Sequence, residues 1–121
     1  MATTDRYDPA AEFHTAEDCY INELRNTGAD RACSISRARV TPGISTRLHC
    51  LEQTAERYVI ISGSGEVTVG TEAAIPVAAF DVVYIPAGVP QQIRNTGSED
   101  LVFLCICTPR FRMENYRDLQ N

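Results

Sequence analysis

The sequence predicts an all-β protein with one domain, built as a β-sandwich or barrel. Two observations lead to this fold class. From Cys33 onward, short runs rich in β-branched and aromatic residues follow one another, and clusters of turn-forming residues separate them. These clusters favour tight turns or positive φ angles, and they are Pro42-Gly43, Gly63-Ser64-Gly65, Pro86-Ala87-Gly88 and Asn95-Thr96-Gly97. With 121 residues, of which 44% are hydrophobic, the chain can bury one continuous core.

The expected strands cover residues 33–40, 45–51, 57–61, 66–69, 81–85, 91–94 and 101–108. Residues 19–24 add one more strand, at a sheet edge or across a dimer, whereas residues 1–18 are polar and aperiodic and predict a loosely held N-terminal arm. We therefore divide the chain into an arm, 1–18, and a single domain, 19–121. Met113, Tyr116 and Leu119 recur at helical spacing after Pro109 and predict a short C-terminal helix.

Charge and cysteine usage exclude several classes of function. Sixteen acidic and eleven basic residues give a formal net charge of -5, which disfavours nucleic acid as a partner. The sequence has neither the apolar run of a secretory signal nor one that could span a bilayer, so we expect no membrane partner. Five cysteines without a C-x-x-C pair indicate free thiols in a reducing, cytoplasmic setting.

Two spaced motifs carry the information about function. In the first, five residues separate Gly43 from His49, and six separate Glu56 from Gly63. In the second, which begins with Pro86-Ala87-Gly88, two residues separate Gly88 from Gln91 and three separate Gln91 from Asn95. The pair resembles the two motifs of the cupin family, and the surrounding sequence is similar to small single-domain bacterial cupins over roughly residues 33–109. The resemblance implies a double-stranded β-helix, which is a jelly-roll barrel that encloses a pocket.

The resemblance also implies a site at His49, Glu56 and Gln91, because cupin metals are generally held by two motif-one histidines, the glutamate and a motif-two histidine. Here Leu51 and Gln91 stand at two of these positions. Strand alternation points His49 and Leu51 to one face and puts Glu56 on the adjoining strand. One imidazole, one carboxylate and one amide oxygen could bind a divalent iron, manganese, nickel or zinc ion. The open alternative is that Glu56 and Gln91 hydrogen-bond His49 without a metal, for structure or for acid–base chemistry.

Arg47 and Tyr58 lie two residues from His49 and Glu56, so strand alternation predicts that both face the pocket. A guanidinium suits a carboxylate or phosphate, and a phenol can position or protonate an oxygen. We thus expect Arg47, Tyr58 and Gln91 to bind substrate. Alternatively, Arg47 pairs with Glu52 or Glu56, and Tyr58 is ordinary barrel packing.

Two hypotheses follow. The leading one is an enzyme acting on a small carboxylated metabolite through a divalent metal or a His49/Glu56 pair, with dioxygenase, isomerase and lyase chemistry all open. The alternative is a metal-free protein that binds or senses a small ligand without changing it. We also expect a homodimer, because residues 19–24 alternate apolar and polar residues and an exposed strand edge invites pairing.

Overall fold

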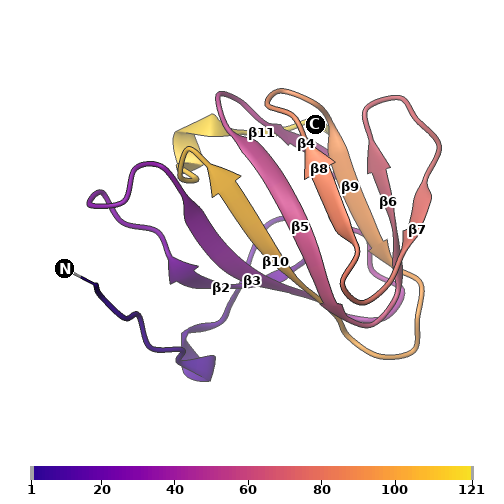
Figure 1. The fold of residues 1–121 in the computed structure, drawn as a ribbon. Helices are drawn as coiled ribbons and strands as arrows, with labels where there is room; N and C mark the ends of the chain where they lie inside the picture. The colour runs from indigo at the N-terminus through magenta and orange to yellow at the C-terminus, as the bar shows by residue number, and fades with distance from the viewer. Residues whose placement is uncertain (1, 121) are drawn as a thin grey trace.

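The computed structural model describes residues 2–120 and confirms the all-β class (Figure 1). The strands form two antiparallel sheets. The six-stranded sheet consists, in spatial order, of β1 (Phe13–His14), β2 (Tyr20–Arg25), β3 (Ser34–Val40), β10 (Leu101–Thr108), β5 (Ala55–Ser62) and β8 (Val82–Ile85). The five-stranded sheet consists of β11 (Tyr116–Asp118), β4 (His49–Leu51), β9 (Gln91–Asn95), β6 (Gly65–Val69) and β7 (Ile75–Val77). From β3 to β11 the chain changes sheet at every connection except that between β6 and β7.

The core lies between the two sheets, because alternate side chains of each strand point inward. On β5, buried Glu56, Tyr58 and Ile60 alternate with the more exposed Arg57 and Val59. The largest fully buried apolar side chains come from both sheets and are Ile60, Ile85, Ile93, Leu101, Val40 and Val67. The same alternation that builds the core therefore puts Glu56 and Tyr58 inside the barrel.

The turn between β5 and β6 requires glycine at position 63. Gly63 has a φ of 88°, and a Cβ atom there would lie 2.6 Å from the backbone oxygen of Asp100. Only a residue without a side chain adopts this conformation at so close an approach. The second glycine of motif one is thus explained by backbone packing.

The segment expected as an arm lies along β2 and β3. It contains the 3-10 turn η1 (Pro9–Ala11) and the short strand β1. Glu12 forms ion pairs with Arg37 at 3.3 Å and Arg39 at 2.6 Å, and the Asn22 side chain donates a hydrogen bond to the Asp8 backbone oxygen. β2 is second in the sheet, since β1 pairs with it at Tyr20 and Ile21, so it is not the outermost strand that the sequence suggested.

The predicted C-terminal helix is wrong beyond its first turn. Residues 113–115 form the single 3-10 turn η2 (Met113–Asn115), and the next three residues form β11. β11 pairs with β4, so that Tyr116 lies opposite Leu51 and Asp118 opposite His49. The exposed edge of β4 offers backbone partners that a free helix lacks, and pairing across the sheet overrides the local spacing. Within residues 2–120, no helix has the length and apolar character needed to cross a bilayer.

Candidate functional site

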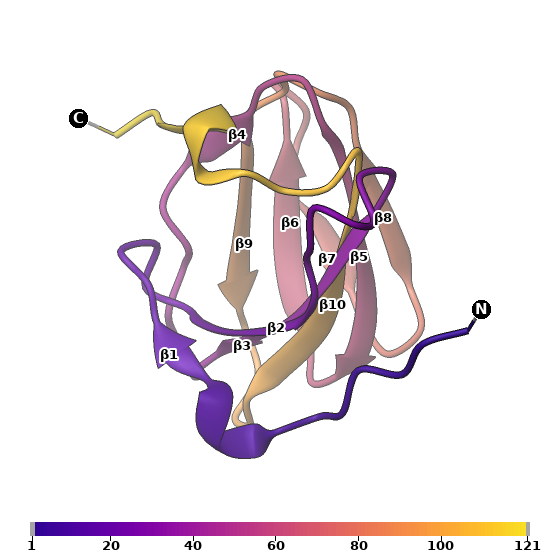
Figure 2. The same cartoon turned by 90° about the vertical axis from the view of Figure 1, so that its left-hand side faces the viewer.

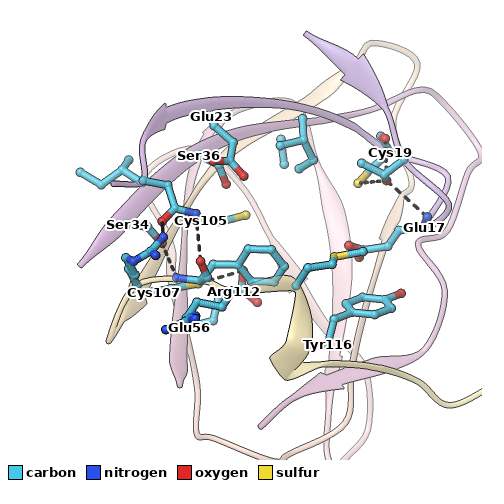
Figure 3. Close-up of a pocket in the computed structure, with 18 of the residues that line it drawn as sticks. Glu17, Cys19, Glu23, Ser34, Ser36, Glu56, Cys105, Cys107, Arg112 and Tyr116 are labelled. Atoms are coloured by element: carbon cyan, nitrogen blue, oxygen red, sulfur yellow. Dashed lines mark hydrogen bonds between the residues drawn. The ribbon is translucent and has the colours of Figure 1, made fainter. Parts of the chain in front are cut away.

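A cavity of about 540 Å³ opens on the inner face of the six-stranded sheet. The segment before β2 and the segment after β10 border it, and Figure 2 shows both on the same side of the barrel. Its wall includes Glu56 and Tyr58 from β5, Cys107 from β10, Glu17 from the N-terminal segment and Tyr116 from β11. Figure 3 shows the labelled carboxylates and thiols of this wall around one space. The volume suits a small organic molecule.

Glu56 is the buried acid of the cavity wall, with only 8% of its surface exposed. Its Oε2 accepts a hydrogen bond from the Cys107 thiol at 3.8 Å, whereas Oε1 has no hydrogen-bond partner within residues 2–120. Burial raises the pKa of this carboxyl from 4.5 to about 7, although the Gln91 amide and the His49 ring favour its charged form. Glu56 can therefore hold or release a proton near neutral pH.

Tyr58 and Gln91 form a buried pair beside Glu56. The Tyr58 hydroxyl donates a hydrogen bond to Gln91 Oε1, and Gln91 is fully buried. Gln91 Nε2 finds no partner in the described part of the chain. Burial raises the pKa of Tyr58 well above its usual value, so the phenol stays protonated and acts as a donor. Gln91 Nε2 and Glu56 Oε1 thus make no hydrogen bond of normal geometry within residues 2–120, although the amide lies close enough to the carboxyl to lower its pKa.

His49 lies opposite Gln91 in the β4–β9 pair, and its ring has three neighbours among residues 2–120. Its Nδ1 lies 2.8 Å from the backbone oxygen of Arg47, so Nδ1 carries a proton, because a carbonyl oxygen can only accept. Its Nε2 lies 3.4 Å from Glu17 Oε2, and its ring stacks on Tyr116 with centroids 5.1 Å apart. Burial raises the pKa of Glu17, and the nearby His49 offsets part of this rise. The Nε2–Oε2 contact forms an ion pair when the imidazole is protonated.

The expected metal set does not converge as a ligand sphere. His49 Nε2 faces Glu17 and not Glu56, and Gln91 Oε1 accepts the Tyr58 hydroxyl. Within residues 2–120, no group of three or more His, Cys, Asp or Glu side chains is arranged to hold a metal ion. A divalent ion would need these donors on one point. The donors as arranged do not fit such a centre, and elemental analysis tests the metal that the motifs suggest.

Arg47 differs from its expected role. Its Nε lies 2.8 Å from Asp118 Oδ2, and Arg47 is absent from the residues that line the cavity. The regular strand begins only at His49, so the backbone between Ser45 and His49 does not keep the alternation of a strand. Thr46 lines the cavity in its place, with its amide bonded to the Ile93 backbone oxygen at 2.9 Å. The ion pair with Glu52 or Glu56 considered above is instead one with Asp118.

Two residues of the site carry no recognisable signal in the sequence. Glu17 lies in a polar, aperiodic segment, and Tyr116 lies in the stretch whose spacing predicted a helix. Both reach His49 through contacts between segments far apart in the chain. Such contacts leave no local pattern, and only the fold brings the pair to the imidazole.

Comparison with known proteins is consistent with this architecture. Residues 36–107 match the Cupin domain family. Protein MJ1618 of Methanocaldococcus jannaschii is 30% identical over 116 residues, which cover 94% of this chain and 92% of that protein. Oxalate decarboxylase OxdC of Bacillus subtilis, a protein with Mn(II) centres, is 31% identical over 104 residues, or 83% of this chain, but this chain spans only 26% of its length.

Among solved structures, the nucleoside dehydratase Pac13 of Streptomyces superposes with a TM-score of 0.78. The match covers 97% of this chain and 92% of Pac13, at 16% sequence identity. At that identity the likeness concerns the fold alone.

Proposed function

The chain belongs to the cupin family, and on that premise we propose that it is a small-molecule enzyme in which Glu56 transfers a proton within the barrel cavity. The observation that carries this proposal is the unpaired Oε1 of Glu56 on the cavity wall. An unpaired buried oxygen costs about 1–3 kcal/mol. A substrate that donates a hydrogen bond to Oε1 removes this cost as it binds.

The neighbours of Glu56 support a role in proton transfer. Its pKa of about 7 lies close to neutral pH, where a general acid or base is most effective. The contact of His49 with Glu17, which itself lines the cavity, supplies a second acid–base pair. One group can then remove a proton from the substrate while the other delivers one.

These groups fit isomerase and lyase chemistry, two of the three classes left open by the sequence. An isomerase removes a proton at one atom and adds one at another, and a dehydrating lyase removes a proton from carbon and protonates the departing hydroxyl, which leaves as water. The similar protein OxdC is named as a decarboxylase, and its name supports the lyase class. Burial raises the pKa of Cys105 and keeps it a neutral thiol. The five free cysteines favour a reducing compartment, and we therefore place the enzyme in the cytoplasm.

Proton exchange with solvent tests the proposal. Pools of small metabolites are incubated with the protein in D₂O, and NMR follows deuterium incorporation and new products. We expect turnover by the wild type that persists after chelator treatment and falls at least about 100-fold in Glu56→Gln. Glu66→Gln is the matched control, because it makes the same change on an exposed residue of β6 outside the cavity.

Three results would contradict the proposal. Full activity in Glu56→Gln would remove Glu56 from the mechanism, and loss of activity on chelation, with recovery on adding manganese or iron, would restore the metal hypothesis. A ligand that stabilises the protein and returns unchanged, without deuterium, would instead support the binding or sensing protein.

A further inference from the structure

A second hollow, also of about 540 Å³, lies beside the cavity and is rich in arginine. Arg31, Arg110 and Arg112 line it, and among residues 2–120 Glu114 is the single acidic residue on its wall. The other lining residues are uncharged: Gly28, Gln53, Pro109 and Asn115. Three guanidiniums against one carboxylate make a local positive site in a chain whose formal net charge is -5. Such a concentration of positive charge attracts anions.

Hydrogen bonds fix the segment that carries two of these arginines. The Arg110 amide donates to the Arg31 backbone oxygen at 3.0 Å, which ties the segment after β10 to the loop before β3. The Phe111 amide donates to Ser34 Oγ at 2.8 Å, and the Thr54 hydroxyl donates to the Pro109 oxygen at 2.5 Å. The backbone under the arginines is therefore held in place before any ligand binds, which lowers the entropy lost on binding.

Most of the guanidinium donors remain available. Arg110 uses Nη1 on Asn26 Oδ1 at 2.9 Å, and Arg112 uses Nε on Glu114 Oε1 at 2.8 Å. The side chain of Arg31 has no hydrogen bond or ion pair to another residue of 2–120. Each guanidinium has five N–H donors in a planar fork that matches the oxygens of carboxylate and phosphate groups.

The two hollows meet at one rim. Arg110, Arg112 and Glu114 line both, and Figure 3 labels Arg112 and Glu56 in the same view of the cavity. We propose that Arg31, Arg110 and Arg112 bind an oxyanion group, a phosphate or a carboxylate, of a small molecule whose other end enters the barrel. That this molecule is the substrate rests on the proposed function, whereas anion binding at the rim does not. The anionic anchor expected at Arg47 thus lies at a different place in the fold.

Binding of simple anions tests the site directly. Inorganic phosphate and acetate are titrated into the full chain at constant ionic strength, and NMR follows the backbone amides of residues 110–115. We expect saturable shifts that weaken at least 10-fold in the double variant Arg31→Gln/Arg112→Gln. Both positions are exposed, so the variant should fold. Arg94→Gln on the exposed face of β9 is the matched control and should bind as the wild type does.

The two anions separate the sources of the oxyanion. Binding of phosphate alone assigns the rim to a phosphorylated molecule, and binding of acetate as well means that a carboxylate suffices. No saturable shift from either anion, or equal affinity in the double variant, overturns the inference. Glu56→Gln must retain anion binding. If it does and the wild type shows no proton exchange, the rim site stands and the proposed function fails.

Discussion

Replacing Glu56 with glutamine is expected to stabilise the protein above neutral pH and to flatten its stability profile between about pH 4.5 and 7. In the wild type the folded carboxyl keeps its proton up to a pH near 7, whereas in the unfolded chain it loses it near 4.5. Between these values the native state binds more protons than the unfolded state. The free energy of unfolding therefore falls as the pH rises through this window and stays low above it.

The size of the effect follows from the two pKa values. Each pH unit between them is equivalent to about 1.4 kcal/mol, so the wild type loses about 3 kcal/mol across the window. A neutral glutamine of the same shape does not ionise and loses none of this. Glu17, whose pKa is also raised, is present in both proteins and cancels in the difference. Glu12 and Asp118, whose pKa values are lowered by Arg39 and Arg47, act at lower pH and cancel too.

Urea unfolding measured at pH 5, 6, 7 and 8 provides the assay, with Glu66→Gln as the control for the same chemical change at an exposed residue. The difference in free energy between Glu56→Gln and the wild type should grow with pH and reach about 3 kcal/mol at pH 8. If the two profiles stay parallel from pH 5 to 8, the carboxyl is not buried as described, and the reasoning fails.

Four further outcomes are expected. Tyr58→Phe leaves the oxygen of Gln91 buried without a donor and should lower the free energy of unfolding by about 1–3 kcal/mol in urea titrations. Gly63→Ala forces a Cβ atom against the backbone of Asp100 at positive φ and should lower it by about 2–4 kcal/mol, measured in the same way. Elemental analysis of protein purified without chelator should give no stoichiometric metal, and a stoichiometric ion that His49→Ala loses would contradict this. The homodimer stays a prediction, which a monomer in sizing chromatography at micromolar concentration would refute.

The β-rich body of the fold could be predicted because its signals are local. Residues 101–108 form a strand with the predicted bounds, and other expected strands differ at their ends by a few residues. β7 was missed because it is short and contains Pro76, which disfavours strand. The final strand was missed because Met113, Tyr116 and Leu119 also suit a helix, and its partner β4 lies far away in the sequence.

The site was only partly predictable for the same physical reason. Motif spacing identified His49, Glu56 and Gln91, and the fold does bring these side chains to one region of the barrel. Which atom each of them faces depends on residues that the motifs do not include. Glu17 takes the free nitrogen of His49, and Tyr58 takes the oxygen of Gln91. These two contacts change the chemistry that the motifs alone suggest.

Glu17 and Tyr116, which flank the imidazole of His49, lie outside residues 36–107, the span shared with the family. The same is true of Arg31, Arg110 and Arg112 at the rim. The barrel is thus a common scaffold to which two flanking segments add the walls of the site. Substitutions in these segments can alter what the cavity accepts without disturbing the strands that hold the barrel together. Relatives that align well across the barrel can therefore act on different molecules, and the flanking segments are where their specificities should be compared.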